Sequence, residues 1–190
     1  MARTIYSAAI VLAAALVSSG VNGADPPSSA GGYVVELYCG KPISMTDASA
    51  AQLYGKAVQL VMSAEQNSND AQWNFPQSEV DQEYVEALAS DYVRVSMANP
   101  LRIETRGGDV RALQIVVRIS PHPPEWRSRY ADHFTDALFT IDENGKTIGY
   151  ALYTGVAAYR LFAAVADIPN HSCRIPPSSE LRRVLDGVRP

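Results

Sequence analysis

The sequence predicts an α+β fold in which an antiparallel meander of four to five strands, with helices packed on one face, forms a single domain. Two stretches alternate apolar and polar residues around tight turns at 107–108 and 144–145, which is typical of β-hairpins. Two earlier stretches, 47–64 and 79–90, instead repeat apolar residues every three or four positions, as amphipathic helices do. Helices that precede a run of hairpins indicate an α+β protein rather than a parallel α/β sheet.

Residues 1–23 predict a cleavable secretory signal peptide. They carry one positive charge and no acid, and their apolar run over 8–17 is too short to span a bilayer. Small residues precede a cleavage position at Ala24, and an uncleaved membrane anchor is the alternative interpretation. Residues 24–32 are rich in Pro, Ser and Gly and predict a flexible leader. We therefore expect an exported protein, periplasmic or extracellular and soluble after signal cleavage, with one domain over 33–190.

The first half of this domain predicts one strand and two helices. Residues 33–38 are β-branched and aromatic, which favours a strand. Thr46 is placed to cap the helix over 47–64, although Gly55 weakens that helix and its second half is also compatible with an extended chain. A polar stretch follows, and Ser78 is the expected cap of the helix that begins at Glu79.

The second half predicts mainly strands, because the apolar period changes from three or four residues to two. The expected strands are 92–95, 101–106, 110–119, 135–141 and 147–153. Residues 156–166 are apolar enough for a buried helix, and 178–187 predict a short terminal one.

Charge excludes one class of function. Residues 1–23 contain one of the 16 basic residues and none of the 20 acidic ones, which leaves 15 against 20, a net charge of −5. We expect no nucleic-acid partner for a domain with this balance. Seven arginines lie between Arg94 and Arg129. They are interpreted either as part of a solvated surface or as an arginine-lined sheet face that receives an acidic ligand.

The two cysteines, Cys39 and Cys173, predict a disulfide bond. An even pair in a small exported domain is most simply a covalent link, and this one closes nearly the whole domain. The alternative is a nucleophilic thiolate on Cys173 assisted by His171. Neighbours in sequence do not by themselves have the geometry that such a pair requires.

The Pro-rich segment after residue 120 holds the candidate catalytic residues. Histidines and carboxylates are the usual proton carriers in hydrolases, and four lie here: His122, Glu125, Asp132 and His133. Their spacing matches no metal-ligand pattern, so we expect no metal and no cofactor.

The same segment holds the candidate binding residues. Aromatic and arginine side chains are enriched at protein interfaces, and Trp126, Arg127, Arg129 and Tyr130 lie together in the chain. The alternative is that these rings only cover the edge of the core.

No motif for a nucleophile, a phosphate or a dinucleotide is present in the sequence. The first hypothesis is therefore an exported, non-enzymatic binding or envelope-accessory module whose partner is a protein or glycan of the cell envelope. Binding would use an exposed sheet face or the segment 121–136. The alternative is a secreted hydrolase whose acid–base residues lie in that segment.

Overall fold

A computed structural model describes residues 32–66, 71–72, 76–105, 108–120, 138–151, 156–175 and 186. The predicted signal peptide, the leader apart from Gly32, and the helix expected over 178–187 apart from Asp186 lie outside the described residues. Of the hairpin turn expected at 107–108, Gly107 also lies outside them, whereas Gly108 is described.

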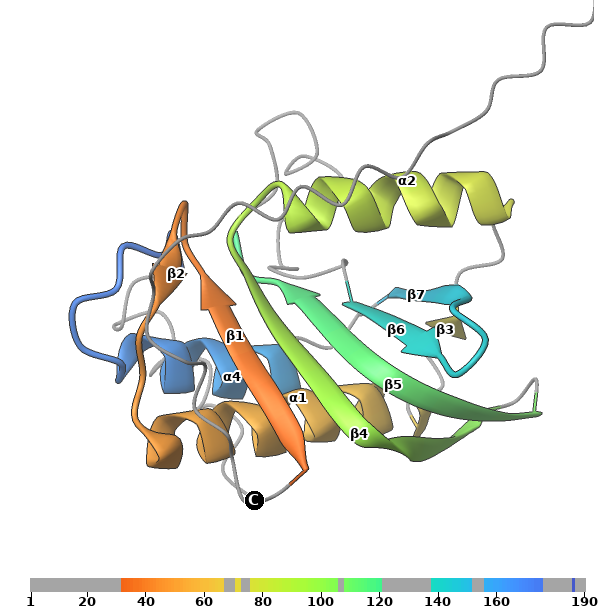
Figure 1. Ribbon diagram of the computed structural model, residues 1–190, viewed down its shortest axis with the longest axis horizontal. Coiled ribbons are helices and arrows are strands. Elements are labelled where there is room, and N and C mark those ends of the chain that lie inside the picture. Colours follow the sequence, from red (N-terminus) through yellow and green to blue (C-terminus); the bar gives the residue numbers. More distant parts are fainter. Residues whose placement is uncertain are drawn as a thin grey trace, which may run out of the picture.

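Seven strands of the described chain form one sheet, in which every neighbouring pair is antiparallel. The spatial order is β2-β1-β4-β5-β6-β7-β3, so the last four long strands form a meander beside β1 (Figure 1). The strands are β1 (Tyr33–Tyr38), β2 (Pro42–Ile43), β3 (Ala71–Gln72), β4 (Tyr92–Thr105), β5 (Gly108–Arg118), β6 (Leu138–Asp142) and β7 (Thr147–Ala151). The predicted α+β class is confirmed. The strand count exceeds the expected four to five because two-residue strands cap both edges.

β4 joins two segments that the sequence predicts as separate strands. Its register against β5 shifts between Ser96 and Leu101, and Pro100 within that interval has no backbone N–H to donate. The strand continues past this irregularity because Ile103 is fully buried against the core beyond it. β4 and β5 together make the long curved ribbon at the centre of the molecule (Figure 1).

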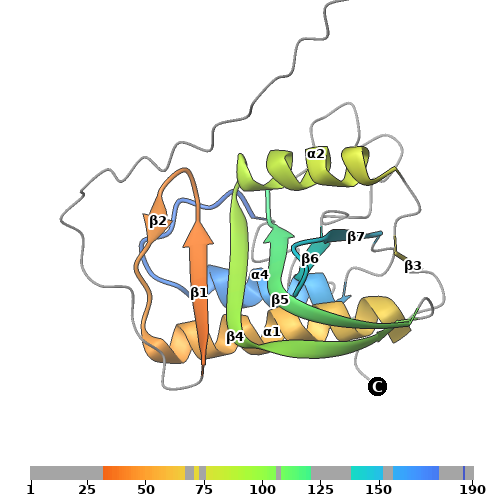
Figure 2. The ribbon, with the colours of Figure 1, turned by 45° about the vertical axis from the view of Figure 1, so that its right-hand side comes forward.

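Helices α1 (Asp47–Gln66) and α4 (Val156–Ala166) lie side by side against one face of the sheet (Figures 1 and 2). α1 begins as predicted, since the backbone N–H of Ser49 donates to Thr46 Oγ1 at 3.2 Å. Its buried side chains are those that the apolar period selects: Ala50, Leu53, Ala57, Leu60, Val61 and Ala64. All of these except Ala50 pack with the inward side chains of β1, β4 and β5 in the larger core.

Helix α2 (Gln77–Leu88) packs on the opposite face, so the expectation of helices on one face holds only for α1 and α4. Val80 and Ala87 of α2 bury Val116 and Phe139 of the sheet in a second, smaller core. The predicted cap is also wrong. Pro76 occupies the N-cap without a side-chain hydrogen bond, and its carbonyl accepts from the N–H of Glu79 at 2.9 Å.

Candidate binding surface

Eight candidate site residues predicted from sequence lie outside the described residues: His122, Glu125, Trp126, Arg127, Arg129, Tyr130, Asp132 and His133. The described chain reaches Ser120 just beyond β5 and resumes at Leu138, the first residue of β6. Leu138 pairs with Val117, so both boundaries of this segment lie at the same end of the sheet.

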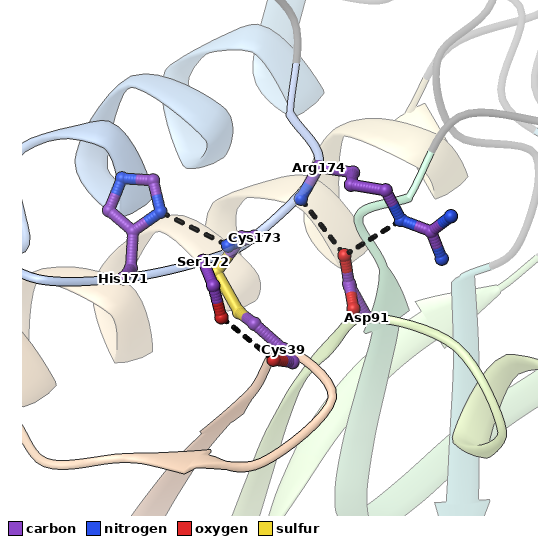
Figure 3. The surroundings of a disulfide bond; sticks show 6 residues. All are labelled: Cys39, Asp91, His171, Ser172, Cys173 and Arg174. Atoms are coloured by element: carbon purple, nitrogen blue, oxygen red, sulfur yellow. Dashed lines mark hydrogen bonds and ion pairs between the residues drawn. A yellow bond between two sulfur atoms is a disulfide. The ribbon is translucent and has the colours of Figure 1, made fainter.

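The predicted disulfide joins Cys39, which follows β1, to Cys173, which follows α4 (Figure 3). The two Cα atoms are 4.7 Å apart across a sequence separation of 134. Ser172 supports the junction by donating from its hydroxyl to the carbonyl of Cys39 at 3.0 Å. Both sulfurs are in the bond, so Cys173 has no thiol for the nucleophilic role that His171 was considered to assist. His171 Nδ1 instead accepts from the backbone N–H of Cys173 at 3.3 Å.

A buried carboxylate holds the same C-terminal segment beside the disulfide (Figure 3). The Asp91 side chain is only 8% exposed, and its Oδ2 accepts from the backbone N–H of Arg174 at 2.9 Å. The Arg174 Nε lies 3.7 Å from the same oxygen. The Asp91 carbonyl accepts from the N–H of Ile119 at 2.8 Å, so one residue connects β4, β5 and the C-terminal segment. A buried charge paired in this way is costly to disrupt.

The face of the sheet opposite α1 and α4 is covered only in part by the described chain. α2 crosses it near β5 and β7, whereas side chains of β1 and the Arg94 side chain of β4 stay partly accessible. Tyr92 of β4 is only 6% exposed and belongs to the smaller core. Val34 is 44% exposed, and the Glu36 and Arg94 side chains are 29% and 33% exposed. We call this surface the open face; it consists of Val34, Glu36, Tyr38, Tyr84, Tyr92, Arg94, Ser96 and Gln114.

Register places these side chains together. Glu36 lies opposite Arg94 across the β1–β4 ladder, and Tyr38 lies opposite Tyr92. Side chains that face each other in this way share one side of the sheet. The Tyr38 and Tyr92 rings are stacked, with centroids 5.2 Å apart and planes 11° from parallel. Leu37 and Val93 alternate with these residues and point into the larger core.

Glu36 is the centre of the polar network on the open face. One of its carboxylate oxygens accepts from the Tyr92 hydroxyl at 2.8 Å, and the other forms an ion pair with Arg94. The Arg94 guanidinium carbon lies 5.8 Å from the centroid of the Tyr92 ring. The three side chains therefore orient one another, as charge-assisted hydrogen bonds and cation–π contacts do.

Tyr84 brings α2 into the same surface. Its ring packs edge-on against Phe139, with centroids 5.7 Å apart and planes at 75°. Its hydroxyl donates to Gln114 Oε1 at 3.4 Å. At the N-terminal end of α2, Gln77 donates from its amide to the carbonyl of Thr147 at 2.9 Å. These contacts fix the position of the helix relative to the sheet.

The phenols of Tyr84 and Tyr92 remain neutral at physiological pH. Burial, reinforced by the hydrogen bond to Glu36 and by its charge, raises the pKa of Tyr92 from 10.0 to about 12, although Arg94 opposes the shift. Burial also raises the pKa of Tyr84, again against the influence of Arg94. Tyr92 and Tyr84 therefore act as hydroxyl donors and acceptors, not as anions.

We expect the raised pKa of Tyr92 to make the protein less stable in alkali. A phenol whose pKa is higher in the fold than in the unfolded chain contributes stability below its unfolded pKa. That contribution is lost as the pH rises from about 10 to about 12. Phenolate absorbance should show one tyrosine titrating near pH 12 that is missing in Tyr92→Phe, and the variant should lose less stability over this range. Titration of every described tyrosine near pH 10 would contradict the assignment.

Sequence reasoning did not single out Glu36, Tyr84, Tyr92 or Gln114. Three of them lie on β1, β4 and β5 and the fourth on α2, and the sequence pattern does not state the register of these strands or the position of this helix. Of the seven arginines considered above, Arg106, Arg127 and Arg129 lie outside the described residues, so the expectation of an arginine-lined face stays a prediction. Arg94, Arg102 and Arg111 lie close to Glu36, Asp109 and Glu143, respectively, so their charges are compensated on the protein itself.

The described residues contain no group of three or more His, Cys, Asp and Glu side chains arranged to hold a metal ion. Among the described helices, none combines the length and the apolarity needed to cross a membrane. No family model matches this chain, and no match was found among curated proteins or solved structures.

Proposed function

We propose that this chain is an exported, non-enzymatic module that binds a protein or glycan component of the cell envelope through the open face. The observation that carries the proposal is the partly exposed Glu36–Arg94 pair, which the buried Tyr92 hydroxyl orients, on a part of the sheet face that no described helix covers at β1. A preorganised group of tyrosine and arginine side chains is favoured at recognition surfaces, because little conformational freedom is lost on binding.

The covalent framework supports the export part of the proposal. The Cys39–Cys173 bond would not persist in a reducing cytosol and is stable outside it. The N-terminal sequence carries the layout of a secretory signal over 1–23. We expect the protein recovered from the host's envelope or medium to lack these residues and to be lighter than the reduced chain by two hydrogens.

The binding part is tested by photo-crosslinking in the native host. A photoreactive amino acid in place of Val34 should capture a component of the envelope, because this side chain is 44% exposed at the edge of the open face. The same residue placed at Gln59, which is exposed on α1, serves as the matched control. Capture from position 34 and not from 59 is expected. Equal capture from both positions, or none from position 34, would contradict binding through this face.

A further inference from the structure

The open face is close to electrically neutral. Glu36 and Arg94 compensate each other in a direct ion pair, and the hydroxyls of Tyr84 and Tyr92 are un-ionised. Arg118, next to the Tyr38–Tyr92 pair at the end of the sheet, adds one positive charge and donates to Ser120 at 3.3 Å. A charged ligand that paired with Glu36 or Arg94 would have to break their ion pair, because each of these two side chains already has its counter-ion.

The polar groups of the open face are fixed and directional. Glu36 receives hydrogen bonds on both carboxylate oxygens, which holds its plane, and Arg94 is held by that pair. Gln114 is contacted by the Tyr84 hydroxyl. Guanidinium, carboxylate and amide groups held in this way have remaining donors and acceptors in fixed directions. Such an array can hydrogen-bond with vicinal hydroxyl groups, because each hydroxyl donates one hydrogen bond and accepts others.

Apolar surface is scarce around this array. Among the described residues the exposed large apolar side chains are Val34 on β1 and Val85 on α2. The fully buried core of a protein interface is more apolar than its polar rim. Val34 and Val85 lie on different elements and do not form such a core, whereas partly exposed tyrosine rings beside polar groups suit the apolar faces of sugar rings.

We propose that the open face binds a neutral, hydroxyl-rich glycan. Glu36, Arg94 and Gln114 hydrogen-bond its hydroxyls, and Tyr38 and Tyr84 contact its ring faces. This inference rests on the proposed function and specifies the partner of the same surface.

The test is calorimetric titration of the disulfide-bonded protein with short neutral oligosaccharides of the β-glucan, α-glucan and chitin types. Heparin and oligogalacturonate serve as anionic comparators. At least one neutral oligosaccharide should bind, with an affinity that changes less than about twofold over a roughly tenfold rise in ionic strength, because no net charge is neutralised. Tyr84→Phe removes one hydroxyl and should weaken binding about three- to tenfold. Tyr54→Phe, a matched loss of a hydroxyl on α1, should leave it unchanged.

A double substitution, Glu36→Gln with Arg94→Gln, keeps polar side chains at both positions and removes both charges. It should weaken neutral-glycan binding by roughly tenfold or more, since charge-assisted hydrogen bonds are the stronger ones. Unchanged thermal melting of each variant shows that the fold is intact.

The remaining outcomes separate the inference from the proposal on which it rests. Salt-sensitive binding of the anionic glycans alone would overturn the neutral-glycan inference. Failure of every glycan, combined with protein capture from position 34, would overturn it and leave the binding-module proposal standing. Failure of both the titrations and the crosslinking would overturn both.

Discussion

Replacing both cysteines, Cys39→Ser with Cys173→Ser, is expected to lower the free energy of unfolding by up to about 5 kcal/mol. The bond closes a loop with a sequence separation of 134, and cross-linking so long a loop removes much of the conformational entropy of the unfolded chain. Urea denaturation of the oxidised protein and of the double variant measures this difference, with the change in slope reporting on the unfolded state.

Two controls separate the covalent bond from its surroundings. Wild-type protein in reducing agent should resemble the double variant. Ser172→Ala keeps the bond and removes only the hydrogen bond to the carbonyl of Cys39, so it should cost about 1 kcal/mol. A double variant as stable as the oxidised protein would show that Asp91 and Ser172 hold the C-terminal segment without the disulfide.

Phe139→Ala is expected to destabilise the protein by about 3–5 kcal/mol and to loosen α2 selectively. Phe139 is completely buried on β6, where it contacts Val80 and Ala87 of α2 in the smaller core. Its removal leaves a cavity under the helix and takes away the edge-on contact with Tyr84. Amide hydrogen exchange should then accelerate more in α2 than in α1. The acceleration in α1 should match the global loss of stability, and that in α2 should exceed it.

Phe139→Leu is the matched control, because it keeps apolar volume beneath α2 and should cost only about 1 kcal/mol. Gln77→Ala tests the other attachment of the helix, the hydrogen bond to Thr147, and should affect mainly the first turn. Equal acceleration of exchange in α1 and α2 after Phe139→Ala would contradict the idea that this ring holds α2 against the sheet in the smaller core.

Much of the local structure was predictable because it depends on neighbours in the chain. The buried positions of α1 follow the apolar period from Ala50 to Ala64, and Thr46 caps the helix through a residue three positions away. The hairpin at Asn144 and Gly145 also has a local cause. Gly145 has φ of 79°, and Asp142 Oδ1 accepts from the N–H of Asn144 at 2.8 Å.

Other features were missed because they depend on distant residues. Ser78 has the right chemistry for a cap, yet α2 begins at Gln77, two residues before the predicted start at Glu79. Pro76 occupies the N-cap, and the Gln77 side chain donates to the carbonyl of Thr147. The two strands predicted on either side of Pro100 are one, because Ile103 and Val110 continue the core beyond the irregularity. The residues predicted for the site over 121–136 remain predictions.

The sequence by itself determined the α+β class, the amphipathic helix over 47–64, the hairpin at 144–145 and the pairing of Cys39 with Cys173. Each of these follows from a local period, a turn residue or a choice of one partner. Only the tertiary structure decided that α2 lies on the opposite face from α1 and that Glu36 meets Arg94. The physical reason is that strand register and helix placement are set by packing between segments far apart in the chain, where alternation specifies two faces but not what covers each.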